Sequence, residues 1–305
     1  MPHAKPIERI RAAFASERGI ALVAVLGFLA VMSLIAIGIV GASRTSVVSS
    51  ARGLLRLQAQ AAVESAVNEA IAELVAANNV KPDIVLAPRR VREGGFTVTV
   101  GVRGEHAKVD LNYADANLLG ILFRAGGADA DKAEALAAAV QDWRDADDLL
   151  RLKGAEKTQY EEAGLNYGPA NGAFRSIDEL RLVLGMTEPL FGCLKPEVTI
   201  FAQRQGIDID HAAPMIRGAA GIEADASASS PMAEQTIAAG DVFEITAWLE
   251  DRARGVRRAE RSIVRLTGNP SDPYWVLAVE PAYPVTEAAK RSCPKAPSTD
   301  NARAP

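Results

Sequence analysis

The sequence predicts an α+β fold in which a long N-terminal α-helix packs on an antiparallel β-sheet and a large all-α domain is inserted between strands. Helical periodicity runs from Ile20 to Ala77, period-two alternation marks strands on both sides of the chain's middle, and short helical segments fill that middle. A chain of 305 residues has room for about two domains. We expect a leader at 1–19, a helix at 20–77, an αβ head at 78–111 and 206–282, the inserted domain at 112–205 and a flexible tail at 283–305.

An apolar stretch runs from Gly19 to Val40, and no charged residue lies between Arg18 and Arg44. A bilayer core requires a helix of about 20 apolar residues, so we expect residues 20–43 to span a membrane. The stretch is too long for the apolar region of a secretory signal peptide, which has about 7–15 residues, but an ordinary single-pass anchor stays open. Basic residues before the stretch predict a cytoplasmic N-terminus and an exported remainder; they are Lys5, Arg9, Arg11 and Arg18.

The helical pattern continues beyond the apolar stretch as an amphipathic segment from Ser43 to about Ala77. Apolar side chains recur at spacings of three and four, and charged ones lie mostly on other faces. At 1.5 Å per residue, a helix from Ile20 to Ala77 is roughly 85 Å long, far more than a bilayer needs. The apolar stripe consists of Val47, Ala51, Leu55, Ala59, Ala62, Ala66, Ala70 and Leu74.

Strands are predicted by alternation in two parts of the chain. Residues 96–102 follow two glycines, and residues 107–111 repeat the pattern after Gly104, so we expect these two segments to form a hairpin. One apolar and one polar face is typical of an antiparallel sheet with one solvated side. Three further strands are expected near the end of the chain, at 242–250, 258–266 and 274–279.

Between these strands, residues 112–205 have the pattern of short helices joined by tight turns. An alanine-rich helix is expected from Ala128 to Trp143. Ser176 and Glu179 have the spacing of a capping box, which predicts the start of another helix, and Gly185 is expected to end it.

The junction before the apolar stretch resembles a processing site. A short basic leader ends in Glu17–Arg18–Gly19 and the apolar run begins at once with Ile20, which resembles the class III leader of type IV pilins and type II secretion pseudopilins. The resemblance implies that a prepilin peptidase cleaves between Gly19 and Ile20 and that the new N-terminus, Ile20, is methylated. It also implies an inner-membrane protein with its head in the periplasm.

Ala24 departs from the pattern of those families. The fifth mature position usually holds a glutamate that pairs with the N-terminal amine of the neighbouring subunit, since an unpaired carboxylate in hydrocarbon is costly. A subunit with Ala24 cannot make this pair. It therefore tolerates a place with no partner on that side, which is the end of a filament, and we interpret the position as tip-determining. The alternative is that the segment is an anchor helix whose sequence has drifted, so that Ala24 has no functional meaning.

The most distinctive residues lie in the middle of the chain. They are Asp142–Trp143–Arg144–Asp145, Asp147–Asp148, Gly154–Ala155–Glu156, Tyr160, Ala163–Gly164, Tyr167, Pro169, Asn171, Phe174, Ser176, Asp178–Glu179–Leu180, Val183 and Gly185–Met186. This set resembles the general secretion pathway protein K family, whose members are minor pseudopilins of the type II secretion system.

That resemblance implies a pilin-like head with an inserted α domain, and a subunit that caps the pseudopilus tip together with the minor pseudopilins I and J. It further implies that the chain primes pseudopilus assembly for protein export across the outer membrane. The other implied partners are the remaining pseudopilins, the inner-membrane assembly platform and the prepilin peptidase, with no small-molecule substrate. A head much wider than the filament gives a steric reason for capping.

A cluster of carboxylates follows the alanine-rich helix. Hard oxygen ligands suit Ca²⁺, and the resemblance adds weight because members of the family hold calcium, so Asp145, Asp147, Asp148 and Glu156 are candidate ligands. The spacing is not that of an EF-hand, since Leu150 stands where its loop needs glycine. A solvated turn neutralised by basic neighbours is the alternative; these are Arg144, Arg151 and Lys153.

Two cysteines, Cys193 and Cys293, are candidates for a disulfide in an oxidising periplasm, with a free thiol at Cys293 as the alternative. The net charge of −4 gives no sign of a general attraction to nucleic acid. A periplasmic helix-hairpin-helix protein that binds DNA stays as the rival function, although Thr187 stands where such a hairpin needs a second glycine. We expect no catalysis, because none of the histidines lies in a catalytic or metal-binding motif; they are His3, His106 and His211.

Overall fold

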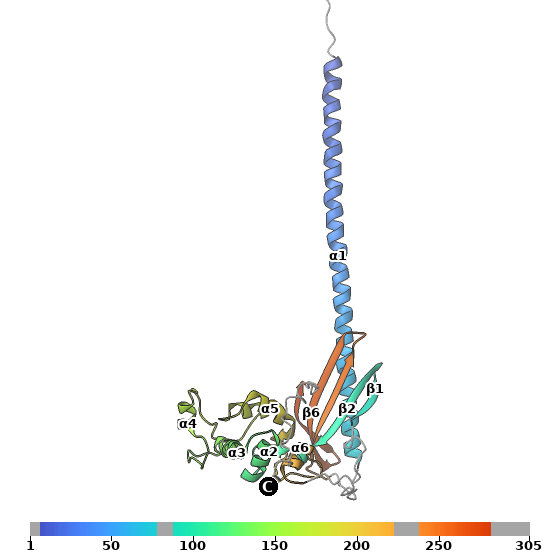
Figure 1. The fold of residues 1–305 in the computed structure, drawn as a ribbon. Helices are drawn as coiled ribbons and strands as arrows, with labels where there is room; N and C mark the ends of the chain where they lie inside the picture. The colour runs from blue at the N-terminus through green and yellow to red at the C-terminus, as the bar shows by residue number, and fades with distance from the viewer. Residues whose placement is uncertain (1–6, 78–87, 223–237, 282–305) are drawn as a thin grey trace, which may run out of the picture. The chain divides into compact units, whose positions relative to one another are not determined.

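The computed structural model describes residues 7–77, 88–222 and 238–281. Helix α1 (Ile7–Ala76) is continuous and begins within the expected leader; its side chains at 7–20 and 38–49 lie outside the description. By its contacts the chain divides into two compact units, residues 1–58 and 59–305, and each is described by itself. The first unit consists of the earlier part of α1, coloured blue in Figure 1.

The second unit contains a five-stranded antiparallel sheet in the order β1-β2-β5-β6-β7. The three C-terminal strands predicted by alternation are confirmed as β5, β6 and β7. The predicted hairpin is wrong: β2 pairs with β1 across Gly94–Gly95, and the segment after Gly104 does not join this sheet. The strands are β1 (Arg89–Glu93), β2 (Phe96–Gly104), β5 (Val242–Asp251), β6 (Val256–Asn269) and β7 (Asp272–Pro281).

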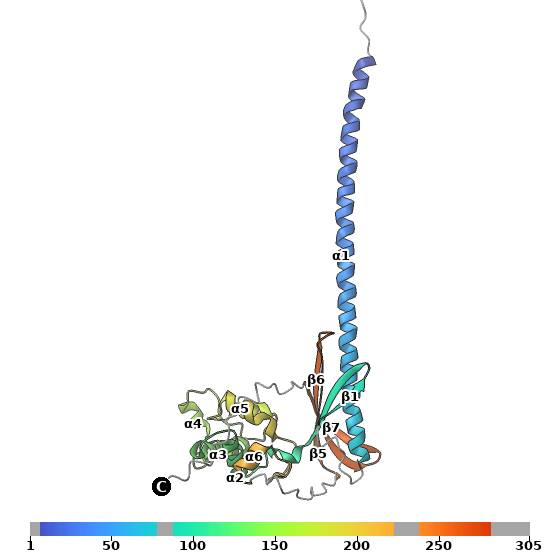
Figure 2. The same ribbon diagram turned by 45° about the vertical axis from the view of Figure 1, so that its right-hand side comes forward.

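The C-terminal part of α1 packs on this sheet. Glu73 of the helix bonds with Arg89 of β1, and Gln60 donates to Glu260 of β6 at 3.4 Å. Figure 2 shows β1 and β6 beside the helix. The predicted stripe is confirmed from Ala59 onward, since every residue of it there is buried, which removes apolar area from water at about 25 cal/mol per Å². The buried helix residues are Ala59, Ala62, Val63, Ala66, Val67, Ala70, Ile71 and Leu74.

A large, mostly helical region separates β2 from β5, as predicted. Its helices are α2 (Ala116–Ala125), α3 (Ala130–Arg144), α4 (Lys157–Glu162), α5 (Glu188–Leu194) and α6 (Pro214–Ala219). Shorter elements are the 3₁₀ helices η2 (Glu105–Ala107), η3 (Ile177–Leu182) and η4 (Lys195–Glu197). Strands β3 (Val109–Asp110) and β4 (Val198–Thr199) pair in parallel in a small sheet of their own.

Local capping explains where these helices begin. The Asp115 carboxylate accepts the Leu118 N–H at 2.7 Å, and Asp129 accepts the Lys132 N–H at 2.8 Å, so both satisfy an orphan donor at a helix start. The predicted capping box at Ser176 is confirmed, but the helix that it opens, η3, is a 3₁₀ helix.

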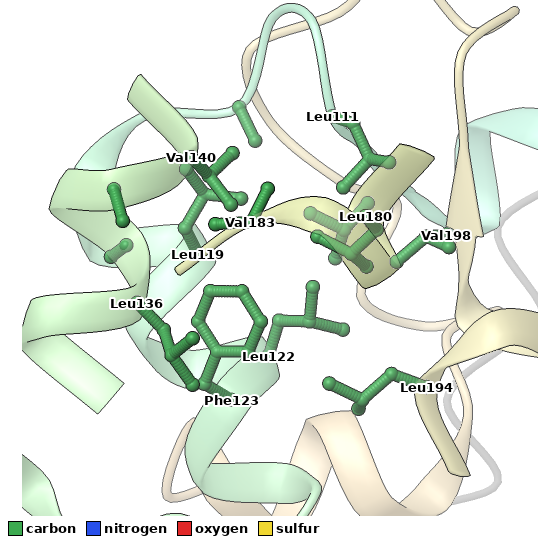
Figure 3. Close-up of a cluster of buried hydrophobic side chains, with 14 of the residues drawn as sticks. Leu111, Leu119, Leu122, Phe123, Leu136, Val140, Leu180, Val183, Leu194 and Val198 are labelled. Carbon is green, nitrogen blue, oxygen red and sulfur yellow. The ribbon is translucent and has the colours of Figure 1, made fainter. Parts of the chain in front are cut away.

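The helices enclose one apolar core. In Figure 3, Leu119 of α2 lies beside Val140 of α3 and Phe123 lies beside Leu136, while Leu122 extends toward the side of Leu194. Its further members include Leu180 of η3, Leu194 of α5 and Val198 of β4. Because this core is separate from the sheet's apolar face, the inserted region has the packing of a domain.

The inserted region leaves and re-enters the sheet at neighbouring positions. Gly104 at the end of β2 lies opposite Phe243 of β5. Arg103 joins β2 to η4 at this junction, since its guanidinium donates to the Pro196 carbonyl at 3.1 Å and pairs with Glu197 at 2.6 Å. The sheet thus places the departure at Gly104 and the return at Val242, whereas the sequence-based boundaries of 112 and 205 stay predictions.

A buried ion network lies at the same junction. The Lys108 ammonium is 2.7 Å from both the Glu105 and the Glu244 carboxylates, and Arg261 of β6 also bonds to Glu244. Lys108 and Glu105 are almost completely removed from solvent. Charges this buried are tolerated only when each has a partner, so the network fixes η2 against β5 and β6.

Acid is expected to weaken this network. Burial alone would raise the pKa of Glu244, but Lys108 and Arg261 lower it to about 2. Since the pKa of the folded state lies below the ordinary value of 4.5, the stabilisation is complete above that value and is lost as the pH falls toward 2. Urea midpoints across this range should fall more for the native chain than for Glu244→Gln. Equal acid dependence of the two chains would contradict the assignment, and Glu161→Gln, on the exposed side of α4, is the control.

Candidate functional site

The expected processing and anchoring sites lie on α1. The side chains of Gly19 and Ile20 are outside the described residues, and Ala24 is exposed on the helix. Within the described residues, no helix meets both the length and the hydropathy needed to cross a membrane. The large apolar side chains at positions 22–37 are exposed. Cleavage, methylation and a membrane span at residues 20–43 therefore stay predictions.

The run Asp142–Trp143–Arg144 at the end of α3 has structural contacts on every side. Trp143 is buried and stacks on Phe174, with ring centroids 5.9 Å apart. The Arg144 guanidinium donates to the Leu111 carbonyl at 2.6 Å. These contacts join α3 to the loops before α2 and before η3, so the most distinctive run of the sequence organises the inserted domain.

Asp142 holds the loop between α3 and α4 in place. Its fully buried carboxylate accepts the Ala155 N–H at 2.8 Å and pairs with Arg151 at 2.9 Å, and Arg151 also bonds to Asp145. The close approach depends on Gly154, because a Cβ there would lie 2.0 Å from Asp142 Oδ2. A side chain at residue 154 and this carboxylate cannot occupy the same space.

Several carboxylate and amide oxygens near the candidate metal ligands accept no hydrogen bond from the described residues. Both Glu156 carboxylate oxygens, Asp145 Oδ1 and Asn171 Oδ1 are buried and accept no hydrogen bond among the described residues. Asn171, with φ at +46°, donates its amide N–H to Asp148 at 2.8 Å. No local sequence pattern assigns Asn171 to this site; asparagine tolerates the left-handed backbone of the turn in which it lies.

Electrostatics at Glu156 reflect the crowding of acids. Burial raises the pKa of Glu156, and the negative charges of Asp142, Asp145, Asp148 and Asp147 raise it further. Such oxygens fit a hard divalent cation in chemical type. Among the described residues, however, no three carboxylate, imidazole or thiol groups are arranged around one point as metal ligands. The donors are therefore adjacent without forming a closed coordination shell.

The alternative interpretation, a turn neutralised by basic neighbours, holds in part. Arg151 pairs with two of the acids, as expected. Lys153 instead turns to α3, where its ammonium is 2.9 Å from Asp131 and 2.8 Å from Glu134. Arg144 donates to backbone carbonyls, so Arg151 is the one basic side chain among the described residues that pairs with these acids.

Two histidines that are far apart in sequence meet at one aspartate. His211 Nδ1 is 2.9 Å and His106 Nε2 is 3.6 Å from Asp208 Oδ2, and burial lowers the pKa of His106. This contact holds the loop at Asp208 against η2. No local motif in the sequence predicts it.

Cys193 is buried in α5 and is not a free thiol. Cys293 lies outside the described residues, so the pairing of these two cysteines stays a prediction.

The turn proposed as the rival helix-hairpin-helix has its basic side chains already paired. Arg181 donates to Glu188 at 2.9 Å, and Lys195 to Asp178 at the same distance. Because a phosphate would have to displace these carboxylates, the local charge disfavours a nucleic-acid site.

Comparisons with known proteins agree with this fold. Residues 104–203, which begin where β2 leaves the sheet, match the family described as type II secretion system (T2SS), protein K. A type II secretion system protein K from Pectobacterium carotovorum subsp. carotovorum is 36% identical over 101 residues. That alignment spans 33% of this chain and only 30% of the relative.

A solved structure extends the similarity to most of the chain. It is a chain from the crystal structure of the GspK-GspI-GspJ complex of the enterotoxigenic Escherichia coli type 2 secretion system, with a TM-score of 0.57 over 78% of this chain and 99% of that chain. At 18% identity the match concerns the fold alone. The comparisons therefore show a region at residues 104–203 that is similar to type II secretion system protein K, within a chain whose fold is similar to that of the solved structure.

Proposed function

We propose that this chain is a minor pseudopilin of a type II secretion system that caps the pseudopilus tip with the minor pseudopilins I and J. The observation that carries the proposal is the inserted helical domain, which leaves the sheet at Gly104 and matches the protein K family. In this role the chain is structural rather than catalytic, and it primes pseudopilus assembly for protein export.

Two features support a place at the tip. The inserted domain adds bulk on one side of the head, as Figure 1 shows for α2, α3 and α5, and a subunit stacked above would have to clear it. Ala24 offers no carboxylate to the N-terminal amine of a neighbouring subunit. In this proposal the chain is a single-pass inner-membrane protein with a periplasmic head, processed by the prepilin peptidase and assembled by the inner-membrane platform with the other pseudopilins.

The head from residue 44 onward is expected to form a stable ternary complex with the cognate I and J heads. Size-exclusion chromatography with light scattering at micromolar concentration measures this directly. Mixtures that lack one partner serve as controls for pairwise binding. Elution of all three as monomers would contradict the tip role, whereas salt-sensitive retention of the head on DNA would favour the rival function.

Calcium binding at Asp145, Asp147, Asp148 and Glu156 is part of the proposal. The donor-free oxygens at Glu156 and Asp145 and the raised pKa of Glu156 support it, because a cation would satisfy both. The ion would brace the loop between α3 and α4, and acid would oppose its binding since the Glu156 carboxylate takes up a proton more readily than usual.

Calcium at about 100-fold above its Kd is expected to raise the melting temperature of the head by roughly 5–10 °C. The paired change Asp147→Ala with Asp148→Ala should abolish this rise. Glu161→Ala with Glu162→Ala is the matched control, because both side chains are exposed on α4 nearby and should leave the rise intact. A melting curve that neither calcium nor chelator moves would show that the metal assignment is wrong.

A further inference from the structure

The loop between α3 and α4 displays three leucines to solvent. Leu149, Leu150 and Leu152 are 75%, 53% and 85% exposed. Among the described residues of 104–203, the other exposed large apolar side chains are Tyr113, Tyr167 and Leu182, none above 45%. The largest apolar exposure of the inserted domain is thus concentrated in four consecutive residues, which we name the leucine loop (149–152). Gathered apolar exposure of this kind is typical of binding surfaces.

The start of the leucine loop is held by side chains on its polar side. Asp147 accepts the Leu149 N–H at 2.9 Å, and Asn171 donates to Asp148 at 2.8 Å. Leu149 and Leu150 therefore follow two anchored residues. The backbone that carries them is held in place by these hydrogen bonds, and their side chains are not buried in the protein's own core.

The end of the leucine loop is fixed as well. Arg151 reaches inward to the buried Asp142, and Lys153 adopts a left-handed backbone with φ at +63° while its ammonium bonds to α3. Leu152 lies between these two anchors and is the most exposed of the three leucines. Since the loop is ordered before it meets a partner, binding loses little conformational entropy.

Charge distinguishes among the possible partners. The cations of the loop, Arg151 and Lys153, are already paired with carboxylates of the domain. Asp147 and Asp148 form no ion pair with any described residue. The charge presented beside the leucines is therefore acidic. Asp147 and Asp148 are also proposed calcium ligands; with the ion bound, the five carboxylates of the cluster still outnumber its two charges and that of Arg151, so the net charge near the leucines stays negative.

We propose that the leucine loop docks into an apolar depression rimmed by lysine and arginine on a partner protein. The leucines supply the apolar anchors, and Asp147 and Asp148 select the basic rim. An anionic membrane surface repels these carboxylates. Two copies of the loop would bring like charges together, so a second copy of the chain fits poorly. The proposal does not depend on a place at the filament tip.

Photo-crosslinking in the host cell tests this with the full-length chain. A benzophenone amino acid replaces Leu149, Leu150 or Leu152 in turn, and replaces Leu182 as the control on the same domain. The three loop positions are expected to give at least five-fold more adduct than the control. Mass spectrometry should place the adduct in one partner protein, within an apolar peptide that contains lysine or arginine.

Charge reversal makes the test specific. Asp147→Lys with Asp148→Lys should lower the adduct yield at least five-fold, and exchange of the partner's basic residues for glutamate should restore it. Glu161→Lys with Glu162→Lys is the matched control and should leave the yield unchanged. Adducts to a second copy of the chain, adducts to lipid, or yields at the level of position 182 would each overturn the proposal. Because the replaced leucines are exposed, an unchanged melting temperature verifies folding.

Discussion

Lys108→Met is expected to destabilise the head by about 3–5 kcal/mol, the cost of removing one partner from a buried ion pair. Lys108 is 2% exposed and is 2.7 Å from the carboxylates of both Glu105 and Glu244. Methionine has a similar length and fills the space, so the loss comes from leaving Glu105 without a cation in a buried site. Urea unfolding followed by tryptophan fluorescence measures the change.

Two variants separate this electrostatic cost from a general effect of losing lysine. Lys157→Met removes an exposed ammonium on α4 and should change stability by less than about 0.5 kcal/mol. The double variant Glu105→Gln with Lys108→Met removes the uncompensated charge and should recover part of the loss. If Lys108→Met unfolds at the same urea concentration as Lys157→Met, the buried network does not stabilise the junction.

Gly154→Ala is expected to destabilise the inserted domain by about 3 kcal/mol or more. The added Cβ would lie 2.0 Å from Asp142 Oδ2, so the carboxylate must leave its buried position and give up the Ala155 N–H and Arg151. Gly154 is not among the glycines with positive φ, so alanine meets steric conflict rather than backbone strain. A lowered thermal midpoint of the full head would report the loss.

Gly192→Ala is the matched control in the same domain. It lies in α5 with no atom within 4 Å of the added Cβ, so the greater helix propensity of alanine should leave stability equal or slightly increased. Equal thermal midpoints for Gly154→Ala and Gly192→Ala would contradict the role of Asp142 as an anchor.

Features with a local cause were predictable from the sequence. The buried stripe on α1 follows from apolar spacing, strands β5, β6 and β7 from alternation, and the start of η3 from a capping box between Ser176 and Glu179. In each case the residues that determine the element lie within a few positions of it, so periodicity and capping chemistry are sufficient.

Strand partners required information that local pattern does not contain. Alternation indicated strands at β2 and at the segment that contains β3. Gly94–Gly95 before β2 and Gly104 after it were equally suitable positions for a hairpin turn. The hairpin partner of β2 is β1, whose residues Arg89–Glu93 show no apolar alternation, and β3 pairs with the distant β4. Pairing depends on the packing of the whole head, which selects among locally equivalent hairpins.

The roles of the individual residues in the candidate site were not predictable from the sequence. The acids near Glu156 raise its pKa, but among the described residues no three of them surround one point, so the metal site stays a prediction. The sequence did not distinguish Asp142, which anchors the loop, from the neighbouring acids. It also did not indicate that Asn171 lies at the site. Those roles follow from burial and from a close approach at Gly154, which spacing along the chain does not reveal.

The junction between β2 and β5 has a consequence for synthesis of the protein. Arg103 and Glu244 are cross-strand neighbours, yet a ribosome must make the whole inserted domain between them. We expect a nascent β1–β2 hairpin to keep an unpaired edge until the inserted domain has been made, because closure of such a long loop is slow. If the domain completes its own core first, it shortens the effective loop and brings the two strands together, so the insertion acts as an internal folding aid for the sheet that carries it.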